Sequence, residues 1–221
     1  MSAGALYRDR QHAGRVLAAK LDRYRDLGDV IVLALPRGGV EVGLQVAQAL
    51  RAPLDVLVVR KLGFPGHEEY AMGAIASGGV QVMNPAAGPH VPAQALRQAL
   101  EREQAELARR KRAYRDGREP MPLGGKTVIA VDDGLATGAT MRAAVIAIRL
   151  QHPAHLVAAT PVGARAACHD LQALADEVVC VQAPHPFHAV GLCYEHFPQA
   201  SDDEVRALLE KARQEHGAAV H

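Results

Sequence analysis

The segment Val128-Ile129-Ala130-Val131-Asp132-Asp133-Gly134-Leu135-Ala136-Thr137-Gly138-Ala139-Thr140 decides the fold that we expect for this chain. Its apolar start is typical of a strand that is buried on both faces of a parallel sheet. Two carboxylates follow, and a turn of small residues then leads into a helix expected near 140–150. In open α/β sheets, ligands bind in the crevice beyond the carboxyl ends of the strands, so this turn is the predicted binding site.

Short apolar runs alternate with helical stretches along the rest of the chain. We expect strands at 30–35, 54–59, 127–132, 155–160 and 177–182, and further helices at 9–25, 40–51, 92–116, 164–174 and 202–215. One or two short strands are expected within 71–83, whereas 62–70 carries Gly63, Pro65 and Gly66 and is expected to form a loop. This alternation predicts an α/β fold with a mostly parallel central sheet of about five strands, flanked by helices.

The length of 221 residues favours a single domain over 1–221. We expect its core at about 26–183 and a C-terminal helix at 202–215. A small hood or lid, drawn from 62–90 and 184–200, is expected to close over the carboxyl ends of the strands.

Composition excludes several classes of protein. The formal charge is +1, from 25 Lys and Arg against 24 Asp and Glu, which argues against a dedicated nucleic-acid binder. Aromatic residues make up 4% of the chain and Trp is absent, so a stacking platform for single strands is not expected. No apolar run approaches the ~18 residues of a membrane helix.

The start of the chain and its cysteines predict a cytoplasmic protein. The first residues include Arg8, Asp9 and Arg10 and show no apolar stretch of the kind that a signal peptide needs. The cysteines at 168, 180 and 193 are odd in number and lack CxxC spacing, so we expect reduced thiols rather than a disulfide framework.

The acidic pair and the turn behind it predict a ligand with two different ends. A turn of small residues entering a helix exposes backbone N–H groups and the positive end of the helix dipole, which together hold a phosphate. Thr137 and Thr140 can add hydroxyl donors. Asp132 and Asp133 would repel a bare polyanion, but they suit a ligand that brings hydroxyls or a cation. A sugar phosphate with a ribose diol and Mg²⁺ meets both conditions.

Residues 128–140 resemble the signature of type I phosphoribosyltransferases, which bind 5-phosphoribosyl pyrophosphate (PRPP). The resemblance implies that Asp132 and Asp133 are catalytic and hold the ribose 2- and 3-hydroxyls. It also implies that the 5-phosphate is wrapped by Ala136, Thr137, Gly138, Ala139 and Thr140. Gly134 departs from the family pattern, in which Val or Ile is usual. The alternative is an ordinary strand–turn–helix whose acids cap the helix or lie on the surface.

Two basic segments resemble the pyrophosphate-binding parts of the same family. Pro36-Arg37-Gly38-Gly39 is similar to its pyrophosphate loop, which implies a cis peptide between Pro36 and Arg37. Arg60 and Lys61, at the end of the expected second strand, resemble the basic pair that contacts pyrophosphate. The resemblance makes Arg37, Arg60 and Lys61 catalytic, because they would stabilise charge on the leaving group. The alternatives are a plain glycine turn and a solvated strand end.

The resemblance gives the segment 62–70 the role of the family's mobile lid. A lid excludes water, which would otherwise hydrolyse a reactive ribosyl cation.

The stretch 187–195 is similar to the hood segment of 6-oxopurine phosphoribosyltransferases. That similarity implies that Phe187 flanks the nucleobase and that Glu195, with Asp133, assists Mg²⁺. One extra residue separates Phe187 from Val190-Gly191, and Glu195 stands where Asp is usual, so packing is an equal reading of Phe187. Ala136 occupies a position that is acidic in the 6-oxopurine enzymes, and the acceptor base is therefore not identified.

The function that the resemblance implies is a Mg²⁺-dependent phosphoribosyltransferase that acts on PRPP and a nucleobase-like nitrogen acceptor and releases pyrophosphate. One rival is a PRPP-sensing regulator that binds nucleic acid, supported only by the basic block 109–112. Another is a PRPP hydrolase. We expect no membrane partner and no nucleic-acid partner, and the chain is compatible with a homodimer.

Overall fold

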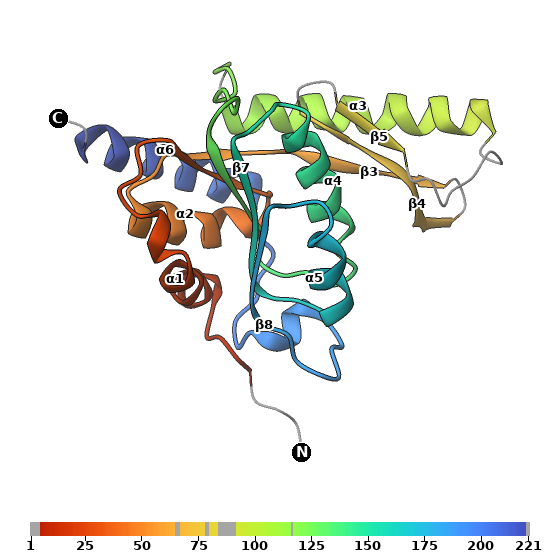
Figure 1. The fold of residues 1–221 in the computed structure, drawn as a ribbon. Coiled ribbons are helices and arrows are strands. Elements are labelled where there is room, and N and C mark those ends of the chain that lie inside the picture. The colour runs from red at the N-terminus through yellow and green to blue at the C-terminus, as the bar shows by residue number, and fades with distance from the viewer. Residues whose placement is uncertain (1–4, 65–66, 78–79, 84–91, 116, 220–221) are drawn as a thin grey trace.

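The computed structural model describes residues 5–64, 67–77, 80–83, 92–115 and 117–219, and its centre is a parallel sheet (Figure 1). The strand order is β2-β1-β6-β7-β8, and every neighbouring pair is parallel. The strands are β1 (Val30–Ala34), β2 (Leu54–Val56), β6 (Thr127–Val131), β7 (His155–Val162) and β8 (Glu177–Gln182). The predicted α/β class and its five-stranded parallel sheet are confirmed.

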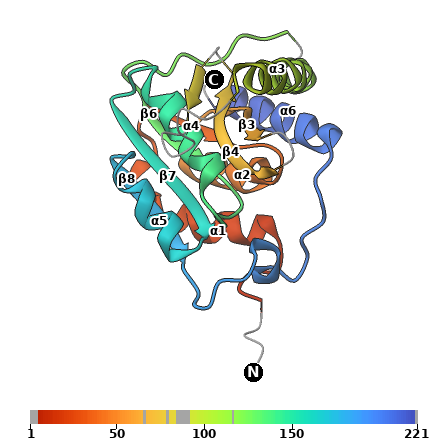
Figure 2. The ribbon, with the colours of Figure 1, turned by 90° about the vertical axis from the view of Figure 1, so that its right-hand side faces the viewer.

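Helices cover both faces of this sheet (Figures 1 and 2). One face carries α1 (Arg10–Lys20), α2 (Gly38–Leu50) and α6 (Asp202–Ala219), and the other carries α4 (Ala139–Arg149) and α5 (Arg165–Leu171). In β1, Val32 faces the first layer and Leu33 the second, and the whole strand is buried. Burial on both sides is the reason that β1 and β6 read as unbroken apolar runs.

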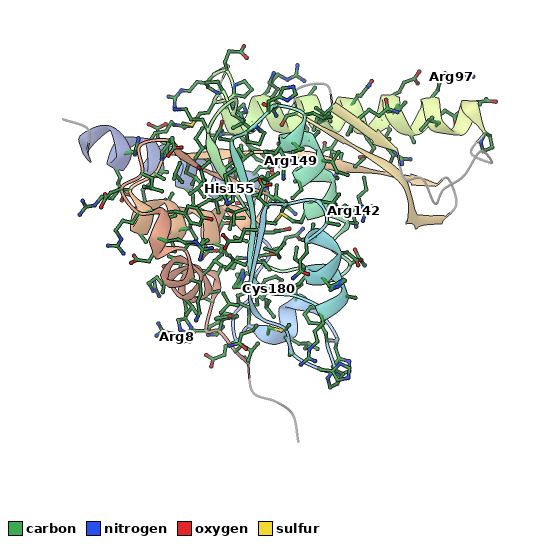
Figure 3. All side chains as sticks on the ribbon, in the orientation of Figure 1. Arg8, Arg97, Arg142, Arg149, His155 and Cys180 are labelled. Carbon is green, nitrogen blue, oxygen red and sulfur yellow. The ribbon has the colours of Figure 1, made fainter. Side chains whose placement is uncertain are left out.

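A second, antiparallel sheet extends to one side of the first (Figure 1). It consists of β3 (Val59–Phe64), β4 (His67–Ala76) and β5 (Val80–Met83), and α3 (Ala93–Arg115) lies along it. Leu96, Ala99 and Leu100 of α3, spaced for one helix face, pack with Leu62 of β3 and Ile75 of β4. Arg97 lies on the part of α3 that projects beyond the central sheet (Figure 3).

The expectations for 54–70 were wrong in two respects. The second strand ends at Val56, and the chain then enters β3, so Arg60 and Lys61 lie near the start of a new strand. The expected loop at 62–70 is largely the β3–β4 hairpin, whose register shifts on both sides of Gly63. These shifts break the two-residue alternation from which a strand is recognised in sequence. Residues 65–66, 78–79 and 84–90 of the expected lid lie outside the described residues.

The remaining elements match the expected ones apart from their ends. The helix expected at 9–25 is α1 followed by a short 3-10 turn, η1 (Asp22–Tyr24), and β8 coincides with its expected range. The segment 184–200 is irregular, as predicted, apart from the 3-10 turn η3 (Val190–Cys193). Among the described helices, none combines the length and the apolar character needed to cross a membrane.

The segment 184–200 folds back onto the beginning of the chain. Tyr7 forms an isolated parallel bridge with Tyr194, and both are buried in a small cluster with Ala13 of α1 and Cys193. Phe187, Val190 and Phe197 pack against this cluster. The beginning of the chain and the segment 184–200 therefore meet beside the carboxyl end of β7, whose Val162 belongs to the same cluster.

Candidate functional site

The carboxyl ends of β1 and β6 form the topological switch point of the sheet. The two strands are neighbours, but the chain passes from β1 outward to β2 and from β6 outward to β7 and β8. The following helices, α2 and α4, lie on opposite faces. The loops after β1 and β6 therefore flank an opening, which is where open α/β sheets bind ligands.

The loop after β1 lies in contact with the strand end of β6. Leu35 N–H donates to the Val131 carbonyl at 2.8 Å. A Cβ at Gly39 would lie 2.8 Å from that same carbonyl oxygen, and a Cβ at Gly38 would overlap the Asp133 carboxylate. These two glycines permit an approach that no other residue allows. The peptide between Pro36 and Arg37 is cis, as the resemblance implied.

The acidic pair stands directly at this contact. Asp133 N–H donates to Asp132 Oδ1 at 2.9 Å, and Tyr194 Oη donates to the Asp133 carbonyl at 2.5 Å. Arg10 of α1 donates from Nε to Asp133 Oδ2 at 2.7 Å. The side chain of Asp133 is thus held by Arg10 near the start of the chain, and its backbone by Tyr194 of the segment 184–200.

Burial raises the pKa of both acids, but the main neighbouring charge differs between the two. It raises the pKa of Asp132 well above the ordinary value, and the neighbouring Asp133 charge raises that pKa further. Burial also raises the pKa of Asp133, but the hydrogen bond and charge of Arg10 oppose that effect. Asp132 is therefore the member of the pair whose ionisation costs the folded protein more.

A cavity of about 160 Å³ opens over the turn that follows the acids. It is lined by Lys61, Asp132, Gly134, Leu135, Ala136, Thr137, Gly138, Ala139, Thr140, Met141 and Val190. Gly138 has φ +71° and precedes the first turn of α4, where a Cβ would lie 3.2 Å from Ala167. The N–H groups of the first turn of α4, which lack partners within the helix, begin at this point and make the cavity suitable for an anion. That of Ala139 donates to Thr137 Oγ1 at 3.4 Å.

A second cavity, of about 340 Å³, adjoins the first through Lys61 and Thr140. It is lined by Pro36, Val59, Arg60, Lys61, Gly63, Arg102, Glu103, Arg110 and Thr140. Arg60 Nη2 lies 2.7 Å from the buried Glu103 carboxylate, which also accepts from Arg102 Nε at 3.0 Å. Because one carboxylate serves two arginines, the cavity keeps an excess of positive charge.

A family model described as "Phosphoribosyl transferase domain" matches residues 3–196. The chain belongs to this family. Over 217 residues it is 46% identical to "Putative phosphoribosyl transferase Rv0571c" of Mycobacterium tuberculosis, covering 97% of this chain and 48% of that protein. This phosphoribosyl transferase domain thus spans about half the length of that relative. It is also 41% identical to TT1426 from Thermus thermophilus, whose crystal structure matches with a TM-score of 0.82 over 93% of this chain and 98% of that chain.

In this phosphoribosyl transferase domain, Phe187 and Glu195 of the segment 184–200 line neither of the two cavities. Phe187 packs against the cluster of Tyr7 and Tyr194, and it does not line either cavity. Glu195 is exposed, and its N–H donates to the Tyr7 carbonyl. In the described part of the chain, no group of at least three His, Cys, Asp or Glu side chains could hold a metal ion. The nucleobase role of Phe187 and the metal role of Glu195 stay predictions.

Sequence reasoning missed three residues that shape the site, namely Arg10, Tyr194 and Val190. Arg10 lies 123 positions from Asp133 and looks like any charged residue of an amphipathic helix. Tyr194 reads in the sequence only as a packing residue, although its hydroxyl binds the Asp133 carbonyl. No local pattern marks such contacts, because only the tertiary fold creates them.

Val190 explains why Gly134 departs from the family signature. A Cβ at Gly134 would lie 2.4 Å from Val190 Cγ1 and 2.8 Å from Cγ2. The space that a valine or isoleucine would fill in the signature is occupied here by a valine from the tail. Glycine at 134 is therefore a consequence of how the segment 184–200 packs.

This packing can be tested with a double-mutant cycle. We expect Gly134→Ala to destabilise the protein by about 1–3 kcal/mol, because the added methyl overlaps Val190. The same substitution in a Val190→Ala background should cost much less, since both Cγ atoms are gone. Urea unfolding of the four proteins measures the coupling, and an equal cost of Gly134→Ala in both backgrounds would contradict the contact.

The approach of the two loops can be tested at Gly39. We expect Gly39→Ala to cost about 1–3 kcal/mol, because its methyl would meet backbone atoms of β6 that cannot move aside cheaply. Gly28→Ala is the matched control, since nothing lies within 4 Å of its Cβ position and the change should stay within about 0.5 kcal/mol. Equal unfolding midpoints for the two variants would refute the close approach.

Proposed function

We propose that this phosphoribosyl transferase domain transfers the 5-phosphoribosyl group of PRPP to a nitrogen of a nucleobase-like acceptor and releases pyrophosphate. The observation that carries the proposal is the pair of adjoining cavities beside the acidic doublet. PRPP carries one phosphate and one pyrophosphate on opposite sides of a ribose ring. Two neighbouring anion sites that share Lys61 and Thr140, one of them lined by Asp132, suit such a molecule better than a single-phosphate ligand.

The 5-phosphate belongs in the smaller cavity. Ala136, Thr137, Gly138, Ala139 and Thr140 line it, and the N-terminus of α4 opens into it. Backbone N–H groups at a helix start hold a phosphate without needing a basic side chain. Asp132 lines the same cavity and would accept hydrogen bonds from the ribose hydroxyls.

The pyrophosphate belongs in the larger cavity. Lys61 is exposed there and adjoins both cavities, so it can reach the leaving group. Arg37 is half-buried at the start of α2 and follows Pro36 of the cavity wall, but it is not itself among the residues that line the cavity. Arg60 is held at the cavity wall by Glu103. Cations fixed in advance around the position where charge develops are the largest single source of rate enhancement in many enzymes.

Mg²⁺ fits this arrangement as a partner of the substrate. The ion usually binds through one or two carboxylates, several waters and substrate phosphates, rather than in an all-protein cage. Asp132 and Asp133 supply such carboxylates, although Oδ2 of Asp133 is already paired with Arg10. When bound, the ion would neutralise charge on the phosphate oxygens and help to orient the pyrophosphate.

Of the two rival functions, the nucleic-acid-binding regulator fits the structure less well. The basic block 109–112 would be the nucleic-acid surface of a regulator, but Arg109 and Arg110 both pair with Glu106, and Arg109 also reaches Asp202. Ion-paired arginines of this kind are typical of a solvated helix face. A PRPP hydrolase would use the same two cavities and differs only in taking water as the acceptor.

A panel of nucleobases assayed with PRPP and Mg²⁺ separates these functions. A transferase should release pyrophosphate only when a suitable base is present. A hydrolase should release it without any base. A regulator should instead show a salt-dependent affinity for RNA or DNA that changes when PRPP is added.

Ligand binding alone can be measured before the acceptor is known. We expect PRPP with Mg²⁺, at about 100 times the dissociation constant, to add ~2.7 kcal/mol of stability and raise the melting temperature by about 5–10 °C. PRPP with a chelator is the control and should give a smaller shift. No shift at millimolar PRPP and Mg²⁺ would count against the proposed function.

Replacement of Asp132 should raise the stability of the free protein while it lowers the affinity for PRPP. Because the folded-state pKa of Asp132 is raised, its ionised form costs stability, and that cost grows as pH rises above the ordinary value of 3.8. We therefore expect Asp132→Asn to raise the melting temperature of the free protein at pH 7. The same change should weaken PRPP binding about 10- to 150-fold, since a charge-assisted hydrogen bond is lost.

Asp176→Asn is the control of opposite sign. Hydrogen bonding from Arg149 lowers the pKa of Asp176, so its charge favours the folded state above that pKa. This variant should melt earlier at pH 7 and bind PRPP normally. The assignment of Asp132 would be refuted if the two variants changed the melting temperature in the same direction and bound PRPP, by calorimetric titration, with the same affinity.

A further inference from the structure

Arg10 is a buried cation that reaches the acidic doublet from α1. Its side chain is 6% exposed, and Nε donates to Asp133 Oδ2 at 2.7 Å. Nη1 donates to the Pro198 carbonyl at 2.7 Å, and the guanidinium lies 3.8 Å from the centre of the Phe197 ring. A buried charge persists only when it is paired and hydrogen-bonded, so these contacts fix the guanidinium in one place.

The two acids of the doublet are not equivalent. Asp133 gives one carboxylate oxygen to Arg10, while its N–H and its carbonyl are engaged by Asp132 and Tyr194. Asp132 lines the cavity over residues 136–140, and Asp133 is not among the residues that line it. The first acid thus faces the ligand space, and the second faces α1 and the tail.

We propose that Arg10 is a positioning residue that neutralises and holds Asp133, so that Asp132 is the carboxylate of the doublet that meets the ribose diol. This inference rests on the proposed phosphoribosyl chemistry and deepens it. Two adjacent carboxylates repel each other and would both repel the phosphates of the ligand. With Arg10 in place, the doublet presents about one negative charge instead of two.

The same arginine connects the doublet to the tail. Phe197 stacks on Tyr194 with ring centres 4.8 Å apart, and Tyr194 in turn donates to the Asp133 carbonyl. Arg10 therefore closes a ring of contacts through Phe197, Tyr194 and Asp133. The segment that supplies two members of this ring also delivers Val190 to the cavity. Loss of the guanidinium should loosen the acid and the tail together.

The test is a double-mutant cycle between Arg10 and Asp133, read out as the affinity for Mg²⁺-PRPP by calorimetry. We expect Arg10→Gln to weaken binding about tenfold, and Arg10→Lys to recover most of the loss because it keeps the charge. Asp133→Asn should also weaken binding, and the double variant should bind no worse than the weaker of the two single variants. Additive losses would mean that Arg10 does not act through Asp133.

Arg115 provides a matched control for folding effects. Its side chain is 7% exposed and pairs with Asp55 at 3.0 Å, and it also donates to the Val56 carbonyl. This buried pair lines a separate small cavity that shares no residue with the two proposed anion sites. Arg115→Gln should therefore lower the melting temperature but leave the affinity for PRPP unchanged.

Phe197→Leu keeps the test decisive should Arg10→Gln not fold. This change leaves both charges in place but removes the ring beneath the guanidinium, and we expect two- to fivefold weaker PRPP binding. An unchanged affinity in Phe197→Leu, or in Arg10→Gln, would overturn this inference alone. Wild-type protein that binds no PRPP would overturn the proposed function, and this inference with it.

Discussion

The arrangement of the site depends on one close approach, between the loop after β1 and the end of β6. Gly39 comes so near the Val131 carbonyl that a single methyl group would not fit, and Gly38 leaves the room that the Asp133 carboxylate occupies. Without this approach, the basic loop after β1 and the acidic doublet after β6 would lie apart and could not contact the same ligand. With it, the cation-bearing loop lies beside the acidic doublet, whose Asp132 carboxylate faces the cavity at this opening of the sheet.

Close approach brings an electrostatic cost that the rest of the molecule offsets. Burial at the strand end raises the pKa of both acids, and the charge of Asp133 raises that of Asp132 further, which opposes folding at neutral pH. The protein meets this with Arg10, whose own burial is in turn satisfied by Asp133, Pro198 and Phe197. The burial of Asp132 remains unfavourable to its charge. The carboxylate whose ionisation lowers the stability of the fold is therefore the one that faces the cavity. Active sites commonly hold groups whose environment opposes their charge.

Local patterns revealed the sheet and the turn behind the acidic doublet, but not the contacts that complete the candidate site. The buried strands β1 and β6 are continuous apolar runs, and the turn behind Asp133 follows its strand directly, so both were predictable. The β3–β4 hairpin was missed because register shifts around Gly63 interrupt the alternation of its side chains. Arg10 and Val190 have no local signal, since their importance lies in partners that are distant along the chain.

The contact between Gly134 and Val190 makes the packing of the turn after the doublet depend on the segment 184–200. The resemblance predicts a branched apolar residue within the signature itself, where it would pack whatever the tail does. Here the turn carries glycine, and the tail supplies the valine that fills the space. The packing of the turn after the doublet therefore depends on the position of the segment 184–200. Since that segment is also anchored through Tyr194 and Phe197 to the doublet and Arg10, a shift of the segment should displace the doublet and the turn behind it as well.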